Sequence, residues 1–435
     1  MENFQILCGI TAVILALYYF LTSNFDFWKS RGVRGPRPIP GFGNLKDVML
    51  GKVMLSDYSM KLYHDYKDEP LIGIFNGRTP ILIVKDPDLI KNVLIKDFPT
   101  FADRELSTVH EKAEPLSQNL FNLEPKRWRP LRAKLSPTFT SRKLKEMFSL
   151  ISECADHLMD YTEELARRNQ PVECRELMAK YAIDVIGRCA FGIEMNALLN
   201  DDSDFRRIRR NVFRPPWSDF LRYKIKNYLP LLYDVLGYIL PDTEITDFST
   251  RFVVDIINYR EKNNIVRKDF IDTLRELKKH SDKVGDFDFT DSLMASQAFS
   301  FFVGFETSSM VMSCALYELA LNQKIQDKLR EEIDEEYTKH DGNLTYEDIK
   351  KMEYLNKIFK ATSKSVYRRS KRYGFPSSRF NVIRVFIQNQ IFSIRKDLVR
   401  RLCKIGTRCF SFLSATGQGI VLVLALPLIK LNLGL

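Results

Sequence analysis

Cysteine and histidine are scarce in this chain, which has seven Cys and five His among 435 residues. No two Cys follow a Cys-x-x-Cys spacing and no two His follow a His-x-x-x-His spacing, so the usual signatures of a zinc module are missing. Seven Cys over this length are also too few for a small disulfide scaffold. We therefore assign no metal-ligating residue from the sequence.

A net positive charge is also missing from most of the chain, although the formal net charge of the whole is +11. The segment 361–435 holds 14 of the 66 Lys and Arg and one of the 55 acidic residues, Asp397. Subtracting these leaves 52 basic and 54 acidic residues in the first 360 positions. No RNA-binding motif accompanies the basic residues of the last segment, so we expect no nucleic-acid partner. The charge shift indicates that two kinds of sequence meet near position 360.

A run without charge lies at the N-terminus, where Phe4 to Leu21 comprises 18 residues. As a helix it would be about 27 Å long, close to the thickness of a bilayer's hydrocarbon core. The basic residues come after it, from Lys29 to Arg37, which favours a retained anchor with the rest of the chain in the cytosol. A cleaved signal peptide is the alternative, but basic residues before the run and a small-residue cleavage site are absent.

A proline-rich segment follows the anchor, with three Pro at alternating positions between Arg34 and Gly41. Such spacing fixes an extended backbone without helix. It is compatible with a stiff elbow between anchor and globular domain, and equally with a generic linker. We predict an anchor at 1–25, a basic linker at 26–44, a globular domain at 45–360 and an aberrant basic tail at 361–435.

The globular part is predicted to be mainly α-helical with a small β-sheet. Two apolar runs flank Asn76-Gly77 between Leu71 and Val84, which is a strong hairpin signal. Asp86-Pro87 then predicts the start of a helix that continues to about Lys96. The remaining sequence shows helical periodicity. The predicted helical runs are 126–168, 175–192, 203–240, 244–280, 291–320 and 322–339.

Two local groups of residues are candidates for a functional site. Trp128 and Arg132 are four apart at the start of a predicted helix, so one face presents an indole N–H and a guanidinium, which suit a carboxylate or a phosphate. The alternative is a core Trp with an Arg snorkelling beside it.

The second group is Glu306 and Thr307, which lie within the apolar run 299–309. A carboxylate there must be paired, neutral or functional. Thr307 can bond the carbonyl of Val303, and Gly304 weakens the helix, so a local distortion is expected. A surface-facing Glu beside a helix-bonded Thr is the alternative.

These residues, with others, resemble the cytochrome P-450 superfamily of haem-thiolate monooxygenases, in particular the insect microsomal detoxification type. The resemblance rests on the N-terminal anchor and on ordered segments that together cover about residues 1–360. These segments are RGPRPIPGFGNL, WRPLRAKLSPTFTSRKLKEMF, QAFSFFVGFETSS, ALNQKIQDKLREEI and GNLTYEDIKKMEYLNKIFK.

The resemblance implies a cytochrome P-450 fold over 45–360 and a haem cofactor. It implies that Trp128 and Arg132 hydrogen-bond a haem propionate, and that Glu306 and Thr307 are the acid–alcohol pair that orders water and delivers protons when dioxygen is activated. It places the segment 101–122 over the substrate. The expected partners are membrane lipid, an NADPH-dependent reductase and a small apolar substrate. The expected location is the endoplasmic reticulum membrane, facing the cytosol.

Two expected elements of this family are missing from the sequence. The thiolate ligand belongs to a Phe-x-x-Gly-x-x-x-Cys-x-Gly loop, and neither Cys403 nor Cys409 stands in such a pattern. The Glu-x-x-Arg motif is replaced by Ala361 and Lys364. We therefore hypothesise that 361–435 is a disrupted form of the haem-binding region. The sequence leaves two functions open: a monooxygenase, or a haem-free, catalytically inactive remnant of one.

Overall fold

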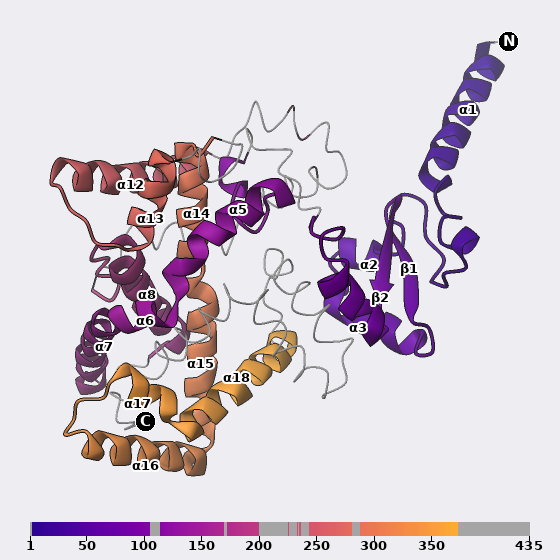
Figure 1. Ribbon diagram of the computed structural model, residues 1–435. Helices are drawn as coiled ribbons and strands as arrows, with labels where there is room; N and C mark the ends of the chain where they lie inside the picture. The colour runs from indigo at the N-terminus through magenta and orange to yellow at the C-terminus, as the bar shows by residue number, and fades with distance from the viewer. Residues whose placement is uncertain are drawn as a thin grey trace. The chain divides into compact units, whose positions relative to one another are not determined.

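The computed structural model describes residues 2–104, 114–168, 172–199, 243–280 and 288–372, together with the single positions 225, 233 and 235. The described residues up to Ala102 form one compact unit, and those from Asp103 onward form another (Figure 1). The predicted helix at 203–240 and nearly all of the predicted tail at 361–435 lie outside the described residues. The four domain boundaries given above remain predictions.

The first unit contains one long helix, one hairpin and several short helices. Its elements are α1 (Glu2–Thr22), η1 (Lys29–Arg31), α2 (Lys46–Met49), α3 (Leu55–Asp65), β1 (Leu71–Asn76), β2 (Thr79–Val84), α4 (Pro87–Lys91) and the π-helical turn η2 (Asn92–Lys96).

Among its described residues, the second unit contains helices joined by loops and no strand. Its elements are η3 (Pro115–Ser117), α5 (Pro125–Leu135), η4 (Ser136–Phe139), α6 (Ser141–Glu146), α7 (Phe148–Arg167), α8 (Cys174–Ile186), η5 (Gly187–Phe191), α12 (Thr243–Lys262), α13 (Phe270–Lys279), α14 (Asp291–Val303), α15 (Phe305–Leu321), α16 (Gln323–Lys339), α17 (Tyr346–Lys351) and α18 (Glu353–Arg372). The predicted mainly α fold with a small β-sheet is confirmed.

The predicted hairpin is confirmed as the antiparallel pair β1–β2, in which Asn76 faces Thr79 across the turn. Gly77 has a φ of 58°, which glycine adopts without strain. Ile72 and Ile74 of β1 pack against Leu62 of α3, so one face of the sheet forms the core of this unit. The predicted helix start is confirmed as well, since the carboxylate of Asp86 accepts hydrogen bonds from two N–H groups in the first turn of α4.

The proline-rich segment lies against β1. The carbonyl of Arg34 accepts a hydrogen bond of 2.9 Å from the N–H of Gly73, and the indole of Trp28 donates one of 2.9 Å to the carbonyl of Ile74. The approach is so close that a Cβ on Gly35 would lie 1.9 Å from the carbonyl oxygen of Gly73. These contacts favour the elbow interpretation over a free linker, because the segment is fixed along its length to the sheet.

Three of the predicted long helical runs are divided, and the run 291–320 separates at Gly304 into α14 and α15. The run 126–168 contains α5, α6 and α7, and the first break falls at η4, where Pro137 supplies no N–H. The run 244–280 is interrupted between α12 and α13, where Asn264 and Lys268 have positive φ values of 53° and 56°. Hydrophobic periodicity continues across the break at η4 and across the break between α12 and α13, because the flanking helices bury faces of the same core. Periodicity alone therefore did not reveal these two breaks.

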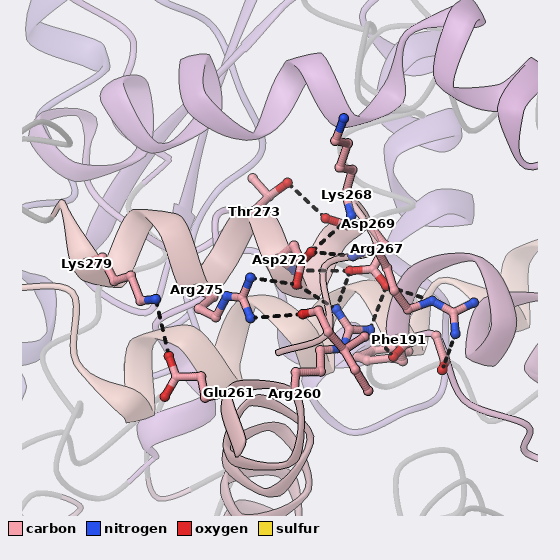
Figure 2. Close-up of polar contacts among 12 residues, drawn as sticks. Phe191, Arg260, Glu261, Arg267, Lys268, Asp269, Asp272, Thr273, Arg275 and Lys279 are labelled. Carbon is pink, nitrogen blue, oxygen red and sulfur yellow. Dashed lines mark hydrogen bonds and ion pairs between the residues drawn. The ribbon is translucent and has the colours of Figure 1, made fainter. Parts of the chain in front are cut away.

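A buried ion network fixes the connection between α12 and α13 (Figure 2). The guanidinium of Arg260, near the end of α12, donates hydrogen bonds of 2.8 and 2.6 Å to Asp269 and of 2.9 Å to Asp272. It also donates one of 2.7 Å to the carbonyl of Phe191, at the end of η5. Asp269 caps the first turn of α13 by accepting from the N–H of Asp272. Three elements therefore meet on one side chain that is only 3% exposed.

The carboxyl of Asp272 has a lowered pKa within this network. Burial alone would raise its pKa, but two backbone N–H groups, of Lys268 and Arg267, and the guanidinium of Arg260 all stabilise the charged form and outweigh burial. Asp272 therefore stabilises the fold fully above its ordinary pKa of 3.8 and loses this contribution as the pH falls through the lower folded value.

Replacement of Arg260 by Met should destabilise the protein strongly, because it leaves Asp269 and Asp272 buried without their cation. We expect a loss of about 3–5 kcal/mol in the free energy of unfolding, measured by urea titration of the detergent-solubilised chain. Arg251→Met is the matched control, since Arg251 is exposed on the same helix. Equal losses in the two variants would contradict the assigned role.

Replacement of Asp272 by Asn should change how stability depends on pH. Between about pH 5 and about pH 3 the wild-type protein should lose stability faster than Asp272→Asn, so that the difference between them shrinks. Asp255→Asn, an exposed position on α12, is the matched control for the substitution itself. A wild-type-to-Asp272→Asn difference that stays constant across this range would refute the lowered pKa.

Candidate functional site

The central helix of the second unit is interrupted at Gly304. α14 ends at Val303 and α15 begins at Phe305. The N–H of Gly304 bonds the carbonyl of Phe301, three residues earlier, at 3.1 Å, which tightens the turn. The expected local distortion is confirmed. The hydroxyl of Thr307 donates 2.9 Å to the carbonyl of Gly304, three residues back, whereas the sequence had suggested the carbonyl of Val303, four residues back.

Glu306 lies in the first turn of α15 and is only 2% exposed. Its carboxylate forms an ion pair with the guanidinium of Arg175 in the first turn of α8. The surface-facing alternative for this glutamate is therefore wrong. A second contact, in which the hydroxyl of Ser313 donates 3.2 Å to the carbonyl of Cys174, ties the same two helices. The acid of the acid–alcohol pair is thus held by a second helix, and its orientation depends on that helix.

Trp128 and Arg132 lie on one face of α5, as their spacing predicts. The indole of Trp128 is 6% exposed, with the guanidinium carbons of Arg104 and Arg129 at 5.3 and 5.6 Å from its ring. Two guanidinium groups therefore lie beside this indole, and Arg132 follows one turn along the same helix, which makes this part of α5 basic and suited to an anion. That this anion is a cofactor carboxylate stays a prediction.

Aromatic packing connects the end of α5 with the interruption in the central helix. Phe139 in η4, directly after α5, lies 5.4 Å from Phe301 of α14 between ring centroids. Phe270 of α13 stacks on the same Phe301 at 4.6 Å. Because Phe301 accepts the hydrogen bond from Gly304, these rings fix the backbone at the interruption relative to η4 and α13.

Two buried polar side chains on α14, which the sequence reasoning missed, hold the segment before α5. The amide of Gln297 donates 2.7 Å to the carbonyl of Gln118 and accepts 2.8 Å from the N–H of Leu120. The hydroxyl of Ser296 donates 2.8 Å to the carbonyl of Leu116. The signal in the sequence was a Ser-Gln pair inside an otherwise apolar helix, since such groups are found buried only with partners. Together they fix part of the segment expected over the substrate.

An apolar cluster lies where these elements meet. Ile245 of α12 is buried at its centre, and the partly buried side chains around it are Leu116, Phe248, Phe299 and Val303. They come from η3, α12 and α14. Val303 directly precedes Gly304, so apolar side chains reach the interruption in the central helix from three segments.

Among the described residues, no cysteine stands in the Phe-x-x-Gly-x-x-x-Cys-x-Gly loop that supplies the thiolate ligand of such a haem. Burial raises the pKa of the Cys154 thiol to about 12 and raises those of Cys174 and Cys189. Cys403 and Cys409 lie outside the described residues. Ala361, at the expected Glu position of Glu-x-x-Arg, lies on α18, where it has no carboxylate to offer.

Comparison with known proteins agrees with the sequence resemblance. The family model described as cytochrome P450 matches residues 33–362. Cytochrome P450 6B7 of Helicoverpa armigera is 36% identical over 362 residues, covering 81% of this chain and 70% of that protein. Cytochrome P450 6j1 of Blattella germanica is 37% identical over 80% of this chain and 69% of its own length. Cytochrome P450 6a2 of Drosophila melanogaster is 38% identical over 82% and 73%. The family match thus ends close to position 360, where the charge changes.

Replacement of Arg175 by Met should leave the buried carboxylate of Glu306 without its cation. We expect a loss of about 3 kcal/mol in the free energy of unfolding, and the double variant Arg175→Met/Glu306→Leu should recover most of it. Arg168→Met is the control, because Arg168 is 63% exposed in its pair with Glu164 and should cost less than about 1 kcal/mol. A double variant no more stable than Arg175→Met alone would show that the pair is not the cause.

Proposed function

The chain belongs to the cytochrome P450 family, and on this premise we propose that it is a membrane-anchored monooxygenase that oxidises small apolar substrates with dioxygen and reductase-supplied electrons. One observation carries the proposal: an acid and an alcohol, Glu306 and Thr307, stand at an interruption in the central helix and beside an apolar cluster. In this family, a proton source next to an apolar pocket is what oxygen insertion into an unreactive substrate needs.

The two site residues have different tasks in this proposal. Arg175 fixes the carboxylate of Glu306, so the acid is held at a defined place at the start of α15. The hydroxyl hydrogen of Thr307 points to the carbonyl of Gly304, which leaves the hydroxyl oxygen able to accept a hydrogen bond from water. Glu306 and Thr307 would together order water and hold a proton at the interruption.

Haem is the cofactor that the family implies. The indole and guanidinium of Trp128 and Arg132 have the donors and the basic surroundings to hold its propionates, and these are the residues we assign to its binding. The iron itself needs a thiolate ligand, and no cysteine among the described residues stands in the loop that would supply it.

The substrate class follows from the cluster around Ile245. The side chains around the buried Ile245 are aliphatic or aromatic and are only partly buried, so apolar surface remains to be covered. An apolar xenobiotic or an endogenous lipid would cover it. The segment that Ser296 and Gln297 hold is the wall on one side of this cluster.

Membrane attachment supports the same function, because apolar substrates partition into lipid. The span Asn3–Thr22 has a mean hydropathy of 2.1 and is not buried, as an anchor requires. The second apolar span, Asp291–Leu321, is 39% buried and serves as the central helix of its unit. We propose the endoplasmic reticulum membrane, with the domain and an NADPH-dependent reductase on the cytosolic side, from the basic residues after α1.

A specific observation favours a second candidate, a haem-free and inactive remnant. The family match stops at residue 362, and Ala361 and Lys364 occupy the Glu-x-x-Arg positions directly at that boundary. Without an organised haem-binding region, Glu306 and Thr307 would have no catalytic role. Such a chain would still insert into the membrane through α1.

A reduced carbon-monoxide difference spectrum of membranes that contain this chain separates the two candidates. The monooxygenase should give a thiolate-type Soret band, and Arg132→Gln should lower haem per polypeptide about tenfold by removing a charged hydrogen bond. Lys134→Gln, an exposed position on the same helix, is the control and should not change it. Absence of any haem band, with the polypeptide present on an immunoblot, would instead establish the remnant.

A further inference from the structure

The turn of the β1–β2 hairpin is attached to the end of the anchor helix by one arginine. The guanidinium carbon of Arg78 lies 3.7 Å from the centroid of the Phe20 ring. The guanidinium donates 3.1 Å to the hydroxyl of Ser23, and the carbonyl of Arg78 accepts 3.4 Å from the amide of Asn24. These contacts hold α1 directly to the hairpin. They add to the contacts of the elbow, which lies against β1.

The sequence of the anchor helix indicates the depth in a membrane at which this contact would lie. Phe20 belongs to the last turn of α1, which ends at Thr22, so the guanidinium sits where the apolar span ends. Tyr18 and Tyr19 in the same turns are 59% and 73% exposed. Tyrosines at this position are typical of the boundary between hydrocarbon and headgroups. A membrane crossed by α1 would therefore place Arg78 at the level of lipid headgroups.

The charge of Arg78 has no counterion in the part of the chain that the structure describes. Among the described residues, no carboxylate lies within ion-pair distance of Arg78, and its Nε is shielded from solvent without a hydrogen-bond partner. Arg34, by contrast, is paired with Glu69 at 2.8 Å. Lys29 and Arg31 are exposed a few residues beyond the anchor. A partly shielded guanidinium needs an anion, and its planar fork matches a phosphate.

We propose that Arg78 binds the phosphate of a lipid headgroup, and that the bound lipid, Phe20 and the hairpin turn together fix the first unit against the membrane surface. Lys29 and Arg31 add attraction for anionic lipid. The anchor is then not a flexible tether, since direct contacts join its end to the hairpin turn and the elbow to β1. This inference rests on the proposed membrane anchoring by α1.

The test uses the full chain in lipid nanodiscs, with a fluorophore on Asn76→Cys in a Cys8→Ser background and nitroxide on the lipid headgroups. Asn76 is exposed in the hairpin, so quenching reports how closely the turn approaches the headgroups. Arg78→Gln should reduce the ratio of docked to undocked turn about fivefold. Arg78→Lys, which keeps the charge without the planar fork, should retain about half of the wild-type ratio. Lys324→Gln, an exposed cation on α16, is the matched control and should not change it.

Equal quenching in wild type and Arg78→Gln would overturn the proposal, as would loss of quenching when free inorganic phosphate is added to the discs. Circular dichroism shows whether Arg78→Gln disturbs folding. If it does, the test uses the wild-type chain, whose quenching must rise when anionic lipid replaces part of the zwitterionic lipid. Extraction of the wild-type chain by alkaline carbonate would show instead that α1 is no anchor. That result refutes the membrane attachment itself, whereas the other outcomes concern Arg78.

Discussion

Polar groups buried on an apolar helix need partners, and this constraint organises the second unit. The α14–α15 helix carries Ser296 and Gln297 before its interruption and Glu306 after it, all nearly inaccessible to solvent. Each takes its partner from a different segment, so each polar group fixes one neighbour in place: η3 and the residues after it on one side, α8 on the other. Gly304 separates the two sets, and the resulting turn is where the acid and the alcohol stand. An unpaired group at any of these positions would cost about 1–3 kcal/mol, and more for the carboxylate.

Features set by neighbours in sequence could be predicted, and features set by distant partners could not. The hairpin turn at Asn76-Gly77 and the Asp86 cap depend on a few adjacent residues, and both form as expected. The shared face of Trp128 and Arg132 depends only on the helical period. The ion pair of Glu306 with Arg175 joins residues 131 positions apart, and no local pattern marks Arg175 as its partner. The sequence indicated only that a carboxylate in this run needed compensation.

The hydrogen bond of the Thr307 hydroxyl, beside the interruption at Gly304, differs from the predicted one. The sequence suggested that Thr307 would bond the carbonyl of Val303, which holds for a regular helix. The N–H of Gly304 instead turns to Phe301, three residues back, and the backbone shortens its repeat there. The hydroxyl of Thr307 bonds the carbonyl of Gly304, also three residues back. Glycine permits this because it stabilises a continuous helix least of the residues in the run.

Helix α18 continues beyond the point where the family match ends. The match ends at residue 362, whereas α18 runs to Arg372. A helix can propagate from an existing turn at one hydrogen bond per residue, so ten further residues need no family-specific partner to remain helical. Continuation of α18 therefore does not indicate a rebuilt haem side. That side depends on a thiolate and on a Glu-x-x-Arg ion pair, which are specific side chains, and at its two positions this chain has Ala361 and Lys364. Local helix formation and cofactor binding are thus independent here, and only the latter decides whether the chain is an enzyme.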